Sequence, residues 1–448
     1  MVKKQYLILG IILLIAAFFR IWQIWQIPPG LYPDEAMNGM DALTSGPQVF
    51  YQNNNGREGL FIAIQWLFLK TFGPEVWALR LVSVFIGILT VLGLYLLAKQ
   101  LFNEKVALFS SFLLAVSFWH INFSRIGFRA IMVPFCLVFF LYFWSVARKK
   151  RFSRSKATRG SYFFYRKKYL LAGLFFGLGF NTYLAWRFMI FALPFLFLKV
   201  PVKKTALFLA VAFIVCLPLG LYFLQNPADF IGRAGGVSIF ATGNWLKTLV
   251  ISLGKTLASF NFVGDFNWRH NYAGSPLLFW PAGILFLIGF VMAIYKRYYV
   301  LLVLFGLMLL PAILTYEGLP HALRMIGVIP VVYLLAGIGL DKLKLSLPIL
   351  LIFFLIIAGA QYHRYFLDWG QRQEVRDAFS QDLADIGRSL IDKNAYVKMN
   401  QGGVLVDGIP MSAQTIKFIT YKKANLNFVQ ELPENCHVQN FGLVSICQ

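Results

Sequence analysis

Long apolar stretches separated by short polar segments dominate the 448-residue sequence. Most of them approach or reach the roughly 17 to 25 residues that an α-helix needs to cross the apolar core of a bilayer. The pattern therefore predicts an all-α polytopic membrane protein with about 11 transmembrane helices. The predicted spans are residues 5–23, 77–98, 106–121, 128–147, 169–185, 187–199, 205–224, 276–295, 298–315, 323–340 and 346–362.

The first apolar stretch follows Met-Val-Lys-Lys at the start of the sequence. It is long enough to cross a membrane, has no small-residue cleavage site and leads into Trp22 and Trp25, residues typical of a membrane interface. We therefore expect a retained first span rather than a cleaved signal peptide. Lys3 and Lys4 would then stay in the cytoplasm, which places the following loop outside.

Lysine and arginine gather in every second loop between the predicted spans. Cytoplasmic loops are enriched in these residues, so the distribution predicts a protein of the cytoplasmic membrane with its N-terminus inside and its C-terminal region outside. The densest basic loop is also expected to face anionic lipids. The basic loops lie at residues 99–105, 148–168, 199–204, 296–297 and 342–344.

The first predicted outer loop, residues 24–76, contains an apolar stretch at 59–70. This stretch is too short to cross a bilayer and ends in Lys70, so we expect a helix that lies along the membrane surface. A polar segment rich in asparagine, residues 53–58, precedes it and is typical of a turn.

The character of the sequence changes after residue 362. Residues 372–392 show a helical amphipathic pattern, and short stretches at 403–406, 415–421 and 441–446 are typical of strands. We therefore predict two domains, a transmembrane catalytic domain at 1–362 and a small extracytoplasmic α/β domain at 363–448. Cys436 and Cys447 can form a disulfide there if the compartment is oxidising.

Composition excludes a soluble protein of this length, because 58% of the residues are hydrophobic and only 14% are charged. The net charge of +23 could suggest a nucleic-acid partner. The basic residues, however, form no continuous stripe interleaved with exposed aromatic residues, and membrane topology accounts for their positions. We expect membrane lipids around the chain and no nucleic acid.

Two adjacent acids, Asp34 and Glu35, follow a segment with three prolines and one glycine just after the first span. Proline and glycine end the helix and direct the chain into a loop, and such loops on a rigid scaffold often carry catalytic groups. The alternative is that the acids occupy the first turn of the next helix, where they stabilise its N-terminus.

Further acids, arginines and histidines lie in the predicted outer loops. A carboxylate can act as a base for a hydroxyl acceptor, and a cation can neutralise a departing phosphate. A sugar linked to a lipid phosphate has such a leaving group. The outer acids and histidines can also bind a divalent metal ion, although their spacing fits no recognised metal motif.

The sequence resembles the PMT-type glycosyltransferases of the GT-C superfamily, which include protein O-mannosyltransferases and aminoarabinose transferases acting on lipid A. The resemblance covers the membrane domain and depends on the order of several short motifs. These are Tyr-Pro-Asp-Glu-Ala at 32–36, Ala-Leu-Arg-Leu-Val-Ser at 78–83, His-Ile-Asn-Phe-Ser-Arg at 120–125 and residues 321–324 before an apolar helix.

The resemblance implies a GT-C fold and an inverting transfer of a sugar from a polyprenyl-phosphate donor to a hydroxyl or phosphate acceptor outside the cytoplasm. It makes Asp34 the general base or orienting carboxylate, with Glu35 and Glu58 as further catalytic acids. The family places a lysine and prolines after the residue matched by Glu58, but this chain has Gly59-Leu60, so Arg57 is expected to supply the cation.

The remaining candidate residues also have simpler interpretations. Arginines near a membrane surface commonly anchor the chain to lipid headgroups, and loop histidines commonly form structural hydrogen bonds. The candidates for binding the donor phosphate are Arg57, Arg125, Arg129 and Arg324, and those for binding substrate are His120, His270, His321 and Asp265.

A transporter or flippase for lipid-linked saccharides is the main alternative function. It predicts ionisable groups deep within the spans and inverted repeats, and neither is evident in the sequence. A purely structural membrane protein gives no reason for the concentration of polar residues in the outer loops. An oligosaccharyltransferase would be expected to carry a Trp-Trp-Asp-Tyr-Gly motif in its soluble domain, and residues 362–448 contain none.

Overall fold

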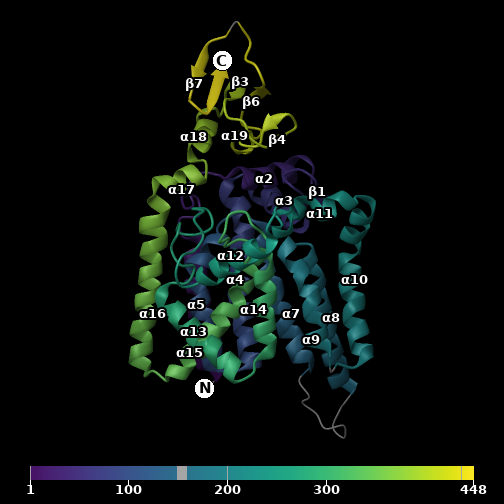
Figure 1. The fold of residues 1–448 in the computed structure, drawn as a ribbon. Coiled ribbons are helices and arrows are strands. Elements are labelled where there is room, and N and C mark those ends of the chain that lie inside the picture. The colour runs from purple at the N-terminus through teal and green to yellow at the C-terminus, as the bar shows by residue number, and fades with distance from the viewer. Residues whose placement is uncertain (1, 149–158, 199, 435, 448) are drawn as a thin grey trace. The chain divides into compact units, whose positions relative to one another are not determined.

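A computed structural model describes residues 2–148, 159–198, 200–434 and 436–447 (Figure 1). Residues 149–158, which form much of the predicted basic loop 148–168, lie outside the described residues. Contacts divide the chain into two compact units. The first contains the residues up to Trp22, Ser83–Ser124 and Arg129–Tyr365, and the second contains Gln23–Val82, Arg125–Phe128 and the residues from Phe366 onward.

The first unit is built from helices. Figure 1 shows α13 beside α15, α15 beside α5, and α8 between α7 and α10, and residue contacts join each of these pairs. The helices of this unit are α1 Val2–Ile21, α5 Glu104–Ala115, α6 Phe118–Phe123, η1 Arg129–Ile131, α7 Met132–Arg148, α8 Arg159–Phe180, η3 Leu184–Ala192, α9 Leu193–Phe197, α10 Val202–Gln225, α11 Pro227–Gly236, η4 Ile239–Ala241, α12 Trp245–Ala258, α13 Trp280–Tyr295, α14 Tyr299–Ile313, η5 Ile326–Val328, α15 Ile329–Leu343 and α16 Leu347–Tyr362.

Glycine allows α13 and α15 to pack closely. A Cβ atom on Gly289 would lie 1.8 Å from the carbonyl oxygen of Leu335, and one on Gly339 would lie 2.1 Å from that of Leu285. Small residues bring helix backbones together in this way in membrane proteins, where packing is a main driving force for helix association.

Every predicted span coincides with a helical segment, including the short pair 169–185 and 187–199. The predicted span at 106–121 is interrupted, because α5 ends at Ala115 and Ser117 begins α6 by accepting a hydrogen bond from the backbone N–H of His120. Among the described residues, five helices are long and apolar enough to cross a membrane. These are Val76–Leu101, Arg129–Arg148, Val202–Gln225, Ile326–Leu343 and Leu347–Gln371. The chain is a multi-pass membrane protein, and the number of crossings stays a prediction.

The second unit joins the first predicted outer loop to the C-terminal residues. Its four-stranded sheet has the order β6-β3-β8-β7, in which β3 is parallel to β6 and the other pairs are antiparallel. Helix α4, Val76–Leu101, and the π-helix η6, His363–Asp368, contribute residues to both units. The other elements are α2 Pro33–Thr44, β1 Phe50–Tyr51, β2 Arg57–Glu58, α3 Leu60–Phe72, η7 Trp369–Gln371, α17 Gln373–Ala378, α18 Gln381–Ser389, β3 Asn394–Met399, β4 Leu405–Val406, β5 Ile409–Pro410, α19 Ala413–Ile419, β6 Asn425–Val429, β7 Val438–Asn440 and β8 Val444–Cys447.

The structure corrects two details of the C-terminal prediction. The stretch 415–421, predicted as a strand, belongs mainly to helix α19, because Ile416 packs into the core beside the sheet while Phe418 packs against α2. The helix predicted at 372–392 is split into α17 and α18, since Ser380 adopts a left-handed conformation with φ 52°. The predicted interfacial helix at 59–70 is α3.

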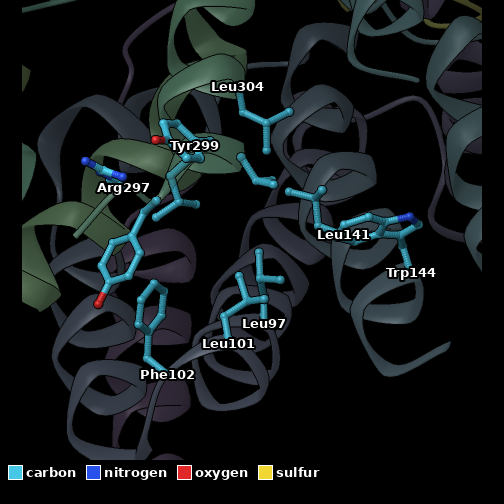
Figure 2. Close-up of a pocket in the computed structure, with 11 residues that line it drawn as sticks. Leu97, Leu101, Phe102, Leu141, Trp144, Arg297, Tyr299 and Leu304 are labelled. Carbon is cyan, nitrogen blue, oxygen red and sulfur yellow. The ribbon is translucent and has the colours of Figure 1, made fainter. Parts of the chain in front are cut away.

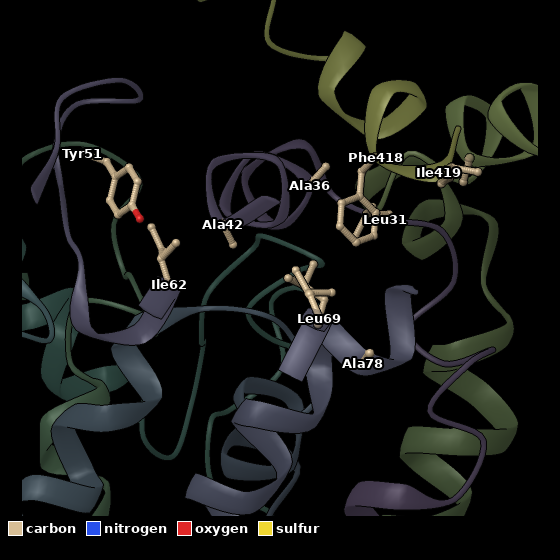
Figure 3. Packing of buried hydrophobic residues seen from close by; sticks show 11 residues of the cluster. Leu31, Ala36, Ala42, Tyr51, Ile62, Leu69, Ala78, Phe418 and Ile419 are labelled. Atoms are coloured by element: carbon tan, nitrogen blue, oxygen red, sulfur yellow. The ribbon is translucent and has the colours of Figure 1, made fainter. Parts of the chain in front are cut away.

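A buried cluster in the second unit packs α2 and α3 against α19 (Figure 3). Phe418 is fully buried there, and a Cβ atom on Gly39 would lie 2.4 Å from its ring. The hydroxyl of Thr415 donates a 2.8 Å hydrogen bond to the carbonyl of Leu31. The C-terminal residues therefore form part of the core that holds α2.

We expect Phe418→Ala to destabilise the protein by about 3–5 kcal/mol, because it removes a buried aromatic ring and leaves a cavity beside α2. Thermal unfolding of the purified protein would measure the loss. Phe441→Ala is the matched control, since Phe441 lies in the same unit and is 47% exposed. Equal melting temperatures for Phe418→Ala and the control would contradict this account of the core.

Cys436 and Cys447 form a disulfide that links the segment before β7 to strand β8. The other two cysteines, Cys136 and Cys216, are free and lie in α7 and α10. The disulfide that the sequence allowed for an oxidising compartment is therefore present in the structure.

Candidate active site

The two adjacent acids occupy the first turn of helix α2. Tyr32 precedes the helix in an extended conformation and Pro33 is its first residue, a position where the missing N–H of proline costs nothing. Successive side chains on a helix point about 100° apart. Asp34 and Glu35 therefore face different surroundings although they are neighbours in sequence.

Glu35 is fully buried and paired on both carboxylate oxygens. Arg80 donates to Oε2 at 3.1 Å and to Oε1 at 3.3 Å, and the backbone N–H of Gly127 donates to Oε2 at 2.7 Å. Arg80 also donates to the carbonyls of Pro28 and Gly30, at 2.7 and 3.0 Å. This network holds the proline-rich loop against α4. The role of Glu35 is therefore to position this part of the chain.

Asp34 keeps a partly exposed carboxylate. Its Oδ1 accepts a 2.5 Å hydrogen bond from Nδ2 of Asn54, on the turn between β1 and β2. Asn54, Asn55 and Gly56 all have positive φ angles, of 54°, 61° and 82°. Asparagine and glycine tolerate this conformation better than other residues, which explains the composition of the turn. The turn thus orients the carboxylate while leaving part of its surface accessible.

Arg57 lies on β2 and is buried beside α2. It forms an ion pair with Asp41 and donates a 2.7 Å hydrogen bond to Oδ1 of Asn38. Burial raises the pKa of Asp41 above its usual value, and the nearby Arg57 partly opposes the shift. Nδ2 of Asn38 donates to the carbonyl of Gly127 at 3.1 Å. Arg57 is therefore engaged by the protein itself.

The other candidates near this loop differ in exposure. Glu58 is buried on β2, where it pairs with Phe50. Arg125 is fully buried and donates from Nε and Nη2 to the carbonyl of Ile27, at 3.2 and 2.6 Å. Arg129, in the first unit, is partly exposed and lies over the ring of Tyr183 at 5.6 Å.

Asp265, His270 and His321 form a separate cluster in the first unit. Their ligand atoms all lie within 4.8 Å of one another. Nδ1 of His270 lies 3.0 Å and Nδ1 of His321 lies 4.0 Å from Oδ2 of Asp265. Backbone N–H groups of Ala322 and Asn267 donate to this carboxylate at 2.8 Å each, which fixes its orientation.

The donor set of this cluster suits a divalent transition metal. Two imidazoles and one carboxylate are typical ligands of zinc, and an imidazole must be neutral to coordinate. Burial lowers the pKa of His270 below its usual value, although its hydrogen bond to Asp265 opposes the shift. The lowered pKa favours the neutral imidazole that a metal requires.

His120 and Arg324 have protein partners. Arg20 of α1 is buried, and its Nη2 lies 2.7 Å from Nδ1 of His120. Arg324 donates to the carbonyl and carboxylate of Glu317, at 2.6 and 3.2 Å, and to the hydroxyl of Thr315 at 2.9 Å. The Glu317 carboxylate is 46% exposed, so this pair lies close to solvent.

Comparison with known proteins finds one family match and several structures of similar fold. Residues 60–222 match the dolichyl-phosphate-mannose-protein mannosyltransferase family. The structure of ArnT from Cupriavidus metallidurans in the apo state aligns with a TM-score of 0.60 and 14% identity, over 96% of this chain and 86% of ArnT. The same protein bound to undecaprenyl phosphate aligns with a TM-score of 0.56 and 14% identity, over 94% and 85%. The chain therefore has the same fold as ArnT.

The similarity of fold extends to a further protein. The apo oligosaccharyltransferase of Archaeoglobus fulgidus aligns with a TM-score of 0.50 and 14% identity, over 94% of this chain and 64% of that protein. No curated protein sequence matches the chain. The predicted all-α membrane architecture with a small C-terminal α/β region is confirmed by these comparisons.

The structure gathers Asp34, Glu35 and Arg57 around α2, and Asp265, His270 and His321 in the separate cluster. Asn54, Asn38, Asp41 and Arg80 are not among the site residues predicted from the sequence. The run of asparagines before a glycine was the available signal for Asn54, since it indicates a turn with positive φ angles. Nothing local indicated that Arg80 pairs with Glu35, because 45 residues separate them.

Proposed function

We propose that this protein is a membrane glycosyltransferase that moves a sugar from a polyprenyl-phosphate donor to an extracytoplasmic hydroxyl or phosphate acceptor. The GT-C fold and the match to mannosyltransferases that use dolichyl phosphate mannose support the reaction class. The ArnT structure with bound undecaprenyl phosphate supports the class of lipid carrier. The sugar and the acceptor are not specified by these observations.

The arrangement of Asp34 carries the proposal. It is the partly exposed acid of the adjacent pair, whereas Glu35 is fully buried and bonded to Arg80 and Gly127. Asn54 holds the Asp34 carboxylate in one orientation. An oriented and partly exposed carboxylate is suited to accept a proton from a hydroxyl group or to align that hydroxyl group for attack.

In the proposed reaction the acceptor oxygen attacks the anomeric carbon as Asp34 takes the proton of the acceptor. The bond between that carbon and the phosphate oxygen breaks, and polyprenyl phosphate leaves with the bonding electrons. Attack opposite the leaving group inverts the configuration. We assign Glu35 to positioning α2, and we retain Glu58 as an auxiliary acid.

Arg129 and Arg324, both in the first unit, are retained as candidates for binding the donor phosphate. Arg57 and Arg125 rank lower because they are more deeply buried, at 2% and 0% exposed against 9% for Arg324, although all three have protein partners. Arg129 is partly exposed, and the exposed Glu317 can exchange its contact with Arg324 for one with substrate. We place His120 in a structural role with Arg20.

The proposed orientation keeps the N-terminus in the cytoplasm and the C-terminal residues outside it. Two observations support this orientation. The basic loops alternate as expected for cytoplasmic segments. The disulfide between Cys436 and Cys447 suits an oxidising compartment.

Release of free polyprenyl phosphate tests the proposal. The purified protein in lipid would be given a panel of polyprenyl-phosphate sugars, with a membrane extract as the source of acceptor. We expect release with one donor class, and only when the extract is present. Movement of intact donor between leaflets without release would instead favour the flippase.

The Asp265 cluster is proposed to bind a divalent metal ion, which would supply positive charge toward phosphate when bound. We expect the wild type to retain about one zinc ion per chain after dialysis, whereas His270→Ala and Asp265→Asn lose it. Elemental analysis would measure the content. His363→Ala is the control, since His363 is exposed in the same unit. Equal zinc content in all four proteins would contradict the site.

A further inference from the structure

A cavity of about 310 Å³ opens in the first unit between the ends of α4, α7 and α14. We call it the α4–α14 groove (Figure 2). It shares no residue with the candidate active site. Its lining residues are Leu97, Leu101, Phe102, Leu141, Trp144, Arg297, Tyr298, Tyr299, Val300, Leu301 and Leu304.

The lining of the groove is amphipathic. Figure 2 shows Leu97, Leu101 and Phe102 on one side and Arg297 with Tyr299 on another. The ring of Tyr298 contacts that of Phe102 with 5.2 Å between centroids. Tyrosine and tryptophan beside an apolar surface are typical of the boundary between lipid chains and headgroups. The lining therefore matches a molecule with an apolar chain and a polar head.

Arg297 supplies a positive charge at the groove. It lies on the turn between α13 and α14, and its side chain is exposed. Within the described part of the chain, its guanidinium forms no ion pair. Its φ angle is 56°, in a position after a helix where glycine is usual. An arginine placed there despite its conformational cost indicates a use for the charge.

The surrounding sequence adds positive charge at this end of the helices. Arg148 lies at the end of α7, with its guanidinium 4.7 Å from the ring centre of Trp144, which lines the groove. The segment 148–168 contains ten lysines and arginines and no acid. Clustered basic residues attract anionic lipids, and a single arginine such as Arg297 suits a single phosphodiester.

We propose that the α4–α14 groove binds an anionic phospholipid. One acyl chain lies along Leu97, Leu101 and Phe102, and the phosphate contacts the guanidinium of Arg297. The groove is distinct from the site proposed for the donor, so this lipid is a bound component rather than a substrate. The inference depends on the groove and its charge and does not require the transferase activity.

Native mass spectrometry of the full-length protein would test the inference, with phosphatidylglycerol and phosphatidylcholine of identical acyl chains. We expect the wild type to retain phosphatidylglycerol in preference to phosphatidylcholine. Arg297→Gln should reduce this preference about fivefold, the effect of removing one basic residue near lipid phosphate. Arg297→Lys should largely retain it.

Leu101→Trp tests the apolar part, because it fills the groove from a residue that is already 39% exposed and therefore should fold. It should reduce binding of both lipids. Lys296→Gln is the matched control, since this neighbouring residue is exposed and does not line the groove. Wild-type binding by both Arg297→Gln and Leu101→Trp would overturn the inference. So would displacement of phosphatidylglycerol by polyprenyl phosphate, which would make the groove a donor site.

Discussion

Asp34→Asn is expected to lower the rate of sugar transfer by about 100- to 10,000-fold, the range that a general acid or base typically contributes. Asparagine has nearly the same shape and can still contact Asn54, but it cannot take a proton. Folding and donor binding should therefore change little. Release of polyprenyl phosphate at saturating donor would measure the rate, and a separate binding assay would measure donor affinity.

Glu374→Gln is the matched control for this variant. Glu374 also lies in the first turn of a helix of the second unit, but its side chain is exposed and it belongs to α17. Removing the carboxylate of Glu374 should leave the rate of sugar transfer unchanged. Normal turnover by Asp34→Asn would remove Asp34 from the mechanism while leaving the fold assignment intact.

Glu35→Ala should have its main effect on folding instead. The change would leave Arg80 charged and fully buried without its counterion. Removing one partner of a buried ion pair typically costs about 3–5 kcal/mol, because the remaining charge is desolvated and unpaired. We expect a large loss of folded protein after extraction from the membrane, together with a lower melting temperature.

The comparison of Glu35→Ala with Glu374→Ala would separate this effect from a general loss of acidic charge. Fluorescence-detected size-exclusion chromatography after heating would measure the folded fraction. Glu374→Ala should behave like the wild type because its side chain is exposed. A stable and well-folded Glu35→Ala protein with reduced turnover would instead return Glu35 to the catalytic acids.

The sequence allowed the helical segments to be predicted because long apolar runs directly reflect the thickness of a bilayer. It did not distinguish Asp34 from Glu35. Their difference depends on Arg80 and Gly127, which lie 45 and 92 residues after Glu35. Only the folded structure shows which of the two carboxylates accepts hydrogen bonds from these distant residues.

The misassigned segment 415–421 illustrates a second limit. Its apolar and β-branched residues favoured a strand by local pattern. In the structure, Ile416 and Phe418 are buried in two different hydrophobic clusters, and a helix allows both to be buried. The Asp265 cluster shows a third limit, because His321 joins Asp265 from far along the chain. Local motifs cannot report a ligand set that tertiary structure assembles.

The hydrogen bond between Thr415 and Leu31 joins residues 384 positions apart. During synthesis, the segment with Asp34 leaves the ribosome hundreds of residues before α19 exists. Helix α2 therefore lacks its final packing partner until α19 has been synthesised, while the intervening helices enter the membrane. A chain that stops before α19 can be inserted and still lack the support of its acidic helix, so competence for transfer arises only near the end of translation.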